Sequence, residues 1–265
     1  MVFGRRKKQE SSTSTNASND GNNSDGNIDF PWKGADLAPC NFAFGHLRDN
    51  LPKLLQQKDG GVHAETYASS IGCIAGFAAQ TSAFEKMKQK GIPFSPPNLN
   101  FISTKNGKTY CFGDTLNFEL CNHWEGEVSG CGLWPLAAGA ASVSGVANAN
   151  LPSLEAMFAH VSSQIGADKV LLRVGSHGQP MAPPEQLLNA VWPIAEMCFS
   201  GTFPNVNHEF GIASVKYRPI IASFLANKII QDVKSVLPPE TALTIVMESA
   251  ILCSKLDPAT VNSKI

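Results

Sequence analysis

The stretch that decides the fold runs from Val62 to Lys90 and reads VHAETYASSIGCIAGFAAQTSAFEKMKQK. Its small residues recur at helical spacing, and the pattern stops at Gly91, with Pro93 shortly after, as helices usually end. We predict a helix from His63 to Lys90. So many small side chains in one helix indicate very close packing against another element. The small residues are Ala68, Gly72, Ala75, Gly76 and Ala79.

A second small-residue helix is predicted from Leu133 to about Ala147. Two helices of this composition in one chain favour mutual packing at a short interaxial distance. We therefore expect the tightest packing of the domain between residues near Gly72 and residues near Gly139.

A β-hairpin is predicted where Asn106-Gly107 separates the β-prone runs Asn100–Lys105 and Lys108–Phe112. A two-residue type I′ turn at this dipeptide would pair Phe101 with Phe112. The fold class is then α+β, a mainly α-helical domain with a hairpin at about residues 100–112 packed on Ala/Gly-rich helices. The remaining predicted helices are Gly45–Gln57, Ser153–Ile165, Glu185–Phe199, Pro219–Val236 and Pro239–Lys255.

The first 29 residues are rich in Ser, Asn, Thr, Gly and Asp, too polar to offset the entropy lost on ordering. We expect a disordered tail over residues 1–29 and one globular domain over residues 30–265. The basic run Arg5–Lys8 is either a solvated end or an anchor for an anionic membrane surface.

Composition disfavours several classes of protein. Hydrophobic residues make up 43% of the chain, and charged residues only 16%, against about 25% in soluble proteins. A net charge of −1 disfavours nucleic acid as a partner. No apolar run reaches the ~18 residues of a membrane span, and no signal peptide is visible. The seven scattered cysteines indicate reduced thiols, and we predict a cytoplasmic protein.

The start of the long helix hints at catalysis. His63-x-Glu65 matches the first half of the zinc-deaminase signature, in which a histidine binds zinc and a glutamate transfers protons. The Pro-Cys-x-x-Cys that completes the signature is absent. The alternative is structural, since Glu65 also suits the positive end of a helix dipole. His63 and Glu65 are the candidate catalytic pair.

A zinc site is a further candidate, because Cys121, His123 and Cys131 lie close together in the sequence. Thiolate and imidazole are preferred zinc ligands. The short Cys-x-x-Cys spacing of zinc knuckles is missing, so ordinary thiols are the alternative. No cofactor is predicted, with zinc as the exception that this cluster leaves open.

Three residues are candidates for ligand binding. Ser69 and Gln80 are polar positions on the tightly packed helix, where they must find partners or face a cavity. His177 lies in the Gly-rich stretch Val174–Pro180, which could hold an anion but matches no phosphate-loop fingerprint.

Several segments together resemble a group of uncharacterised bacterial proteins: His63–Thr66 leading into Gly72–Gln80, then Tyr110–Asn117, Leu133–Ala140 and Val246–Ala250. The resemblance extends over most of the chain after about Phe30. It implies a single domain and brings no activity with it.

The leading hypothesis is a non-catalytic domain that binds a small molecule or a protein partner, or self-associates. A low charge fraction and the lack of a complete catalytic motif favour it. The alternatives are a zinc-dependent, deaminase-like hydrolase that uses His63 and Glu65, and a membrane-surface adaptor that uses the basic tail.

Overall fold

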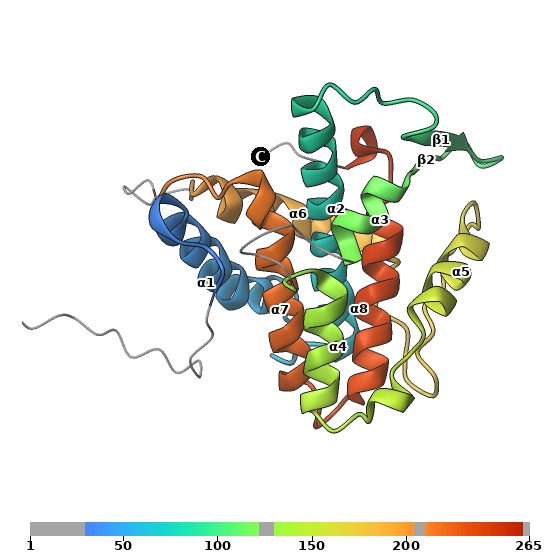
Figure 1. The fold of residues 1–265 in the computed structure, drawn as a ribbon. Coiled ribbons are helices and arrows are strands. Elements are labelled where there is room, and N and C mark those ends of the chain that lie inside the picture. Colours follow the sequence, from blue (N-terminus) through green and yellow to red (C-terminus); the bar gives the residue numbers. More distant parts are fainter. Residues whose placement is uncertain (1–29, 122–129, 204–209, 262–265) are drawn as a thin grey trace, which may run out of the picture. The chain divides into compact units, whose positions relative to one another are not determined.

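The computed structural model describes residues 30–121, 130–203 and 210–261. In these ranges it is a mainly helical domain of eight α-helices with one two-stranded antiparallel hairpin, which confirms the predicted class (Figure 1). The expected disordered tail, with its basic run, lies outside the described residues. The elements are α1 (Leu37–Leu54), α2 (Ala64–Gln89), β1 (Asn100–Ser103), β2 (Thr109–Phe112), α3 (Asp114–Cys121), α4 (Leu133–Val143), α5 (Leu154–Gln164), α6 (Pro184–Ser200), α7 (Arg218–Asp232) and α8 (Pro239–Cys253).

Two helices differ from expectation. α1 begins at Leu37, eight residues before the predicted start, and continues through Pro52. α3 occupies a segment for which no helix was predicted. By contrast, α5 matches its prediction closely, and the Ser153 hydroxyl caps it by accepting a hydrogen bond from the Ala156 N–H at 3.2 Å. No helix of the described chain is long and apolar enough to cross a membrane.

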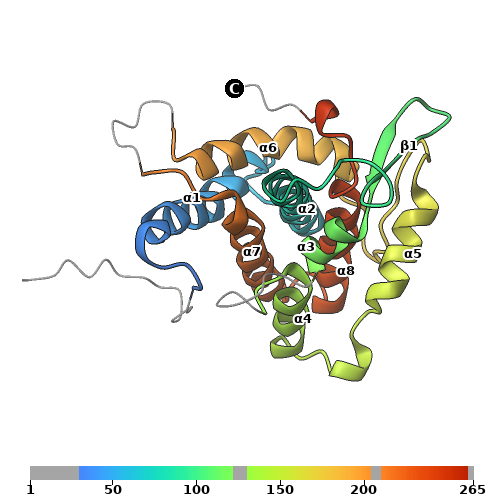
Figure 2. The same cartoon turned by 45° about the horizontal axis from the view of Figure 1, so that its top comes forward.

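The central element is α2. Every residue from Ala68 to Gln80 is buried, so this helix has no solvent-facing side over more than three turns. Figure 2 looks nearly along its axis and shows α6, α7, α8 and α3 around it. Small side chains are required here because the surrounding helices approach from all directions.

The closest approach is between α2 and α8, which run in the same direction. A Cβ atom added to Gly72 would lie 2.3 Å from the Val246 carbonyl oxygen, and one added to Gly76 would lie 2.1 Å from the Ala250 oxygen. Both distances are far below van der Waals contact, so the two backbones meet directly at these glycines.

The predicted pairing of Gly72 with Gly139 is wrong. A Cβ at Gly139 would meet nothing within 4 Å. α4 packs instead on α7, where the Asn227 side-chain amide donates to the Leu136 carbonyl at 2.9 Å. Composition identified α2 correctly as a closely packed helix, but it could not name the partner of α2, and it predicted a close contact at Gly139 that the structure does not have.

The hairpin forms as predicted, with a register shifted by one residue. Phe101 pairs with Cys111 and not with Phe112. The connection has three residues because Thr104 N–H donates to the Lys108 oxygen at 2.8 Å, while Gly107 N–H donates to the Thr104 oxygen at 3.0 Å. Gly107, at φ +81°, supplies the left-handed residue that such a turn needs.

β2 holds the hairpin on the domain. The Cys111 N–H donates to the Lys255 carbonyl at 2.7 Å, and Tyr110 forms an isolated bridge with Leu256. All four residues of β1 are exposed. The hairpin therefore has a fixed inner strand and an open outer one, with β1 at the outer edge (Figure 1).

Candidate functional sites

The predicted pair His63 and Glu65 is joined by two further residues at the start of α2. The Nε2 atom of His63 lies 3.3 Å from the Glu65 carboxylate, and its Nδ1 lies 2.9 Å from the Thr66 hydroxyl oxygen. His177, from the Gly-rich stretch, places its Nδ1 3.9 Å from the other carboxylate oxygen. The sequence did not indicate that His177 and Glu65 would meet.

This cluster links the 174–184 segment to α2. The Met181 N–H donates to the Thr66 hydroxyl at 2.9 Å, beside the contact between His177 and Glu65. The two imidazole rings are about one-third exposed, and the Glu65 carboxylate is less exposed than either ring, so solvent can reach the cluster. Imidazole and carboxylate are side chains of the kinds that enzymes use in general acid–base catalysis.

Of the predicted zinc ligands, Cys121 does not lie near His63. α3, which ends at Cys121, packs beside the later turns of α2, where the Ser82 hydroxyl donates to Glu119 at 2.8 Å. Nineteen residues of helix separate Ser82 from His63, a rise of roughly 28 Å. Burial raises the pKa of the Cys121 thiol to about 12.

Cys131 is half-buried, and His123 lies outside the described residues. Among the described residues, no three His, Cys, Asp or Glu side chains are arranged to hold a metal ion. The zinc cluster therefore stays a prediction.

Ser69 and Gln80 are both fully buried in the contact between α2 and α8. The Ser69 hydroxyl lies 2.8 Å from that of Ser249. The Gln80 amide donates to the carbonyl oxygens of Ser254 at 3.0 Å and Leu256 at 2.7 Å. Each residue has thus found a protein partner, which is one of the two outcomes expected for polar groups on this helix. The buried Oε1 atom of Gln80 has no hydrogen-bond partner among the described residues.

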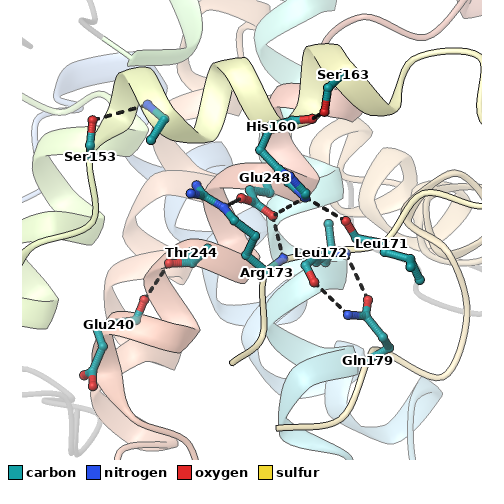
Figure 3. Close-up of polar contacts among 11 residues, drawn as sticks. Ser153, His160, Ser163, Leu171, Leu172, Arg173, Gln179, Glu240, Thr244 and Glu248 are labelled. Atoms are coloured by element: carbon teal, nitrogen blue, oxygen red, sulfur yellow. Dashed lines mark hydrogen bonds and ion pairs between the residues drawn. The ribbon is translucent and has the colours of Figure 1, made fainter. Parts of the chain in front are cut away.

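One buried carboxylate was missed by sequence reasoning. Glu248 on α8 is fully buried and accepts hydrogen bonds from the Arg173 backbone N–H at 2.8 Å and side-chain Nε at 2.5 Å (Figure 3). His160 on α5 lies 3.7 Å from it and 2.9 Å from the Leu171 oxygen. A lone glutamate in the apolar run 242–252 was the available signal, since buried acids are almost always paired.

The Glu248 cluster fastens the segment around Arg173 to α8, as the Glu65 cluster fastens the same segment to α2 further along. Within that segment, Gln179 exchanges two hydrogen bonds with the Leu172 backbone, at 2.7 and 3.0 Å (Figure 3). Both carboxylates are thus engaged in holding one irregular stretch of chain, residues 171–181, against the helices.

The outer edge of β1 is a third candidate, of a different kind. Phe101 and Ile102 are 50% and 48% exposed. The Thr104 backbone N–H donates to the Lys108 carbonyl on the β2 side of the hairpin. Because the backbone groups of successive residues in a strand alternate in direction, the N–H and C=O groups of Phe101 and Ser103 point away from β2. None of these four groups has a hydrogen-bond partner among the described residues. The edge can therefore accept another strand.

No protein-family model matches the chain, and neither a curated protein nor a solved structure shows significant similarity to it. The resemblance to uncharacterised bacterial proteins stays a prediction.

Proposed function

We propose that this is a non-catalytic binding domain that self-associates by pairing β1 with β1 of a second copy. The exposed edge of β1 carries this proposal. An edge strand with free backbone groups is a template for strand addition, which natural proteins usually block with charge, proline or a covering element. The strand Asn100-Phe101-Ile102-Ser103 has neither charge nor proline.

Self-pairing fits the chemistry of this edge. Two copies related by a two-fold axis would place β1 antiparallel to itself and form a four-stranded sheet. Because the strand is uncharged, no like charges would face each other across the axis. Four residues a side bury far less than the ~1,200 Å² of a stable interface, so the dimer is weak and concentration-dependent.

The test is sedimentation velocity over a series of protein concentrations. The wild-type mass should rise toward twice that of the chain, and Ile102→Lys should keep the protein monomeric because it places charge on both edges of the new pair. Val236→Lys is the matched control, since Val236 is 68% exposed and lies outside the hairpin. A monomer at every concentration, or a dimer that Ile102→Lys leaves intact, contradicts the proposal.

A zinc-dependent hydrolase is the second candidate, and the meeting of His177 with Glu65 favours it. Two imidazoles beside one carboxylate are the residue types of catalytic zinc sites. Among the described residues these side chains are not arranged to hold a metal ion, so this candidate requires His63 and His177 to turn toward a shared ion. Elemental analysis of tag-free protein should then find about one zinc per chain, and Glu65→Ala should lose it without unfolding. Protein free of metal after purification without chelator would remove this candidate.

A further inference from the structure

A pocket of about 240 Å³ lies behind the hairpin, between β2, the first turns of α6 and the segment after α8. Its volume is below the roughly 300–1,000 Å³ of sites for drug-sized ligands. It therefore suits a metabolite of roughly ten non-hydrogen atoms. Its walls include Lys108, Tyr110, Glu185, Asn189, Leu256 and Val261.

The hydrogen bonds and ion pairs among the lining residues centre on Glu185. Tyr110 donates its hydroxyl to one carboxylate oxygen at 2.9 Å, and the Lys108 ammonium pairs with the other. Tyr110 is fully buried, and burial raises the pKa of its phenol, which keeps the donor protonated. A carboxylate has about four acceptor positions, so Glu185 retains capacity for a ligand.

The charged side chains of the lining are partly exposed, and the lining also contains aliphatic side chains. The side chains of Lys108 and Glu185 are 41% and 19% exposed. Leu256 and Val261 are nearly buried hydrocarbon on the pocket wall. One positive and one negative group lie side by side, next to an aliphatic surface.

We propose that this pocket binds a free α-amino acid with an aliphatic side chain. The ligand's ammonium group faces Glu185 and its carboxylate faces Lys108, so each charge of the ligand meets the opposite charge. Its side chain covers Leu256 and Val261. Separating Lys108 from Glu185 to admit the ligand should cost little free energy, because partly exposed ion pairs contribute little to stability.

Calorimetric titration of the full chain with L-leucine tests the charge pattern. Saturable binding is expected for leucine. N-acetyl-L-leucine lacks the ammonium group and L-leucinamide lacks the carboxylate, so each should bind about tenfold more weakly or worse. Equal binding of all three compounds, or no saturable heat at millimolar leucine, would overturn the proposal.

Two variants test the location. Val261→Trp should fill the pocket and abolish leucine binding, while both charged residues stay in place. Glu185→Gln should weaken binding about tenfold. Lys105→Met is the matched control, because Lys105 is an exposed lysine of the same hairpin that does not line the pocket. Circular dichroism checks that each variant is folded, and undiminished binding by folded Val261→Trp would sink the assignment.

Discussion

α2 and α4 are built from the same kinds of residues and occupy opposite situations. Both are rich in alanine and glycine, yet α2 is buried on all sides from Ala68 to Gln80, while the Cβ position of Gly139 on α4 is open and Val143 is 80% exposed. Small residues permit close packing only where another backbone lies next to them. The α8 backbone lies against Gly72 and Gly76 of α2, whereas no atom lies within 4 Å of the Cβ position of Gly139.

The largest expected effect sets the two glycines against each other. In Gly76→Ala the new methyl would be 2.1 Å from the Ala250 carbonyl oxygen, a backbone atom that cannot rotate away. We expect a loss of about 3 kcal/mol or more in unfolding free energy, because α2 and α8 must separate. Gly139→Ala should instead gain about 0.5–1 kcal/mol from helix propensity. Urea denaturation measures both.

The comparison fails if the two substitutions cost the same. A mild effect at Gly76 would mean that α8 can shift along α2 at little cost. A large loss at Gly139 would mean that α4 has a close neighbour.

The sequence could reveal the helices and the hairpin because their signals are local. The small-residue spacing of α2, the Ser153 cap of α5 and the Asn106-Gly107 turn each depend on a few neighbouring residues. The partner of Gly72 and the hairpin register depend on more. Val246 is 174 positions away, and the register changed because the turn took one extra residue, Lys105.

The second prediction concerns polar side chains on the two helices. Gln80→Leu should cost about 2–3 kcal/mol, because it leaves the buried Ser254 and Leu256 carbonyls without their donor. On α4, Ser142 donates to Asn148 at an exposed position. Ser142→Ala should therefore stay within about 0.5 kcal/mol of wild type. If thermal denaturation shows Gln80→Leu to be neutral, the amide does not tie α2 to the end of α8.

A smaller effect is expected at the paired hydroxyls of α2 and α8. Ser69→Ala should cost about 1–2 kcal/mol, because the buried Ser249 hydroxyl loses its partner. The double variant with Ser249→Ala should cost less than the sum of the two single ones, which a double-mutant cycle measures. Ser70→Ala is the control, since the buried Ser70 hydroxyl has no partner in the part of the chain that the structure describes. Additive costs would contradict the pairing.

As with the fold, the sequence predicted the local part of the candidate site and missed the contacts between distant segments. His63 and Glu65 stand at a helix start, and the His-x-Glu pattern there was enough to nominate both as candidate residues. His177 and Arg173 reach α2 and α8 through an irregular stretch of chain, whose path has no periodicity to read. Contacts of that kind follow from tertiary packing, so the sequence could nominate His177 but not its partner.

A second comparison, between α4 and the end of α8, concerns charge. α4 contains no charged residue, whereas the chain leaving α8 buries Lys255, which is 2% exposed. The Lys255 ammonium donates to the Asn117 side chain at 2.9 Å and lies 5.4 Å from the Phe158 ring centre. Burial lowers the pKa of Lys255 from 10.5 to about 8, against the opposing influence of the Cys111 and Cys121 thiols.

The smallest predicted effect follows from the pKa of Lys255. The folded chain releases this proton near pH 8 and the unfolded chain only near 10.5, so the unfolded state binds more protons in between and stability rises with pH. Relative to Lys255→Met, wild type should gain about 0.8 kcal/mol between pH 7 and 8.5. The buried thiols lower stability as pH rises in both proteins and cancel in this difference. If the unfolding free energies of the two proteins change with pH in parallel, Lys255 keeps its charge in the core. Its contacts with Asn117 and the Phe158 ring would then compensate for the lost hydration of the ammonium group.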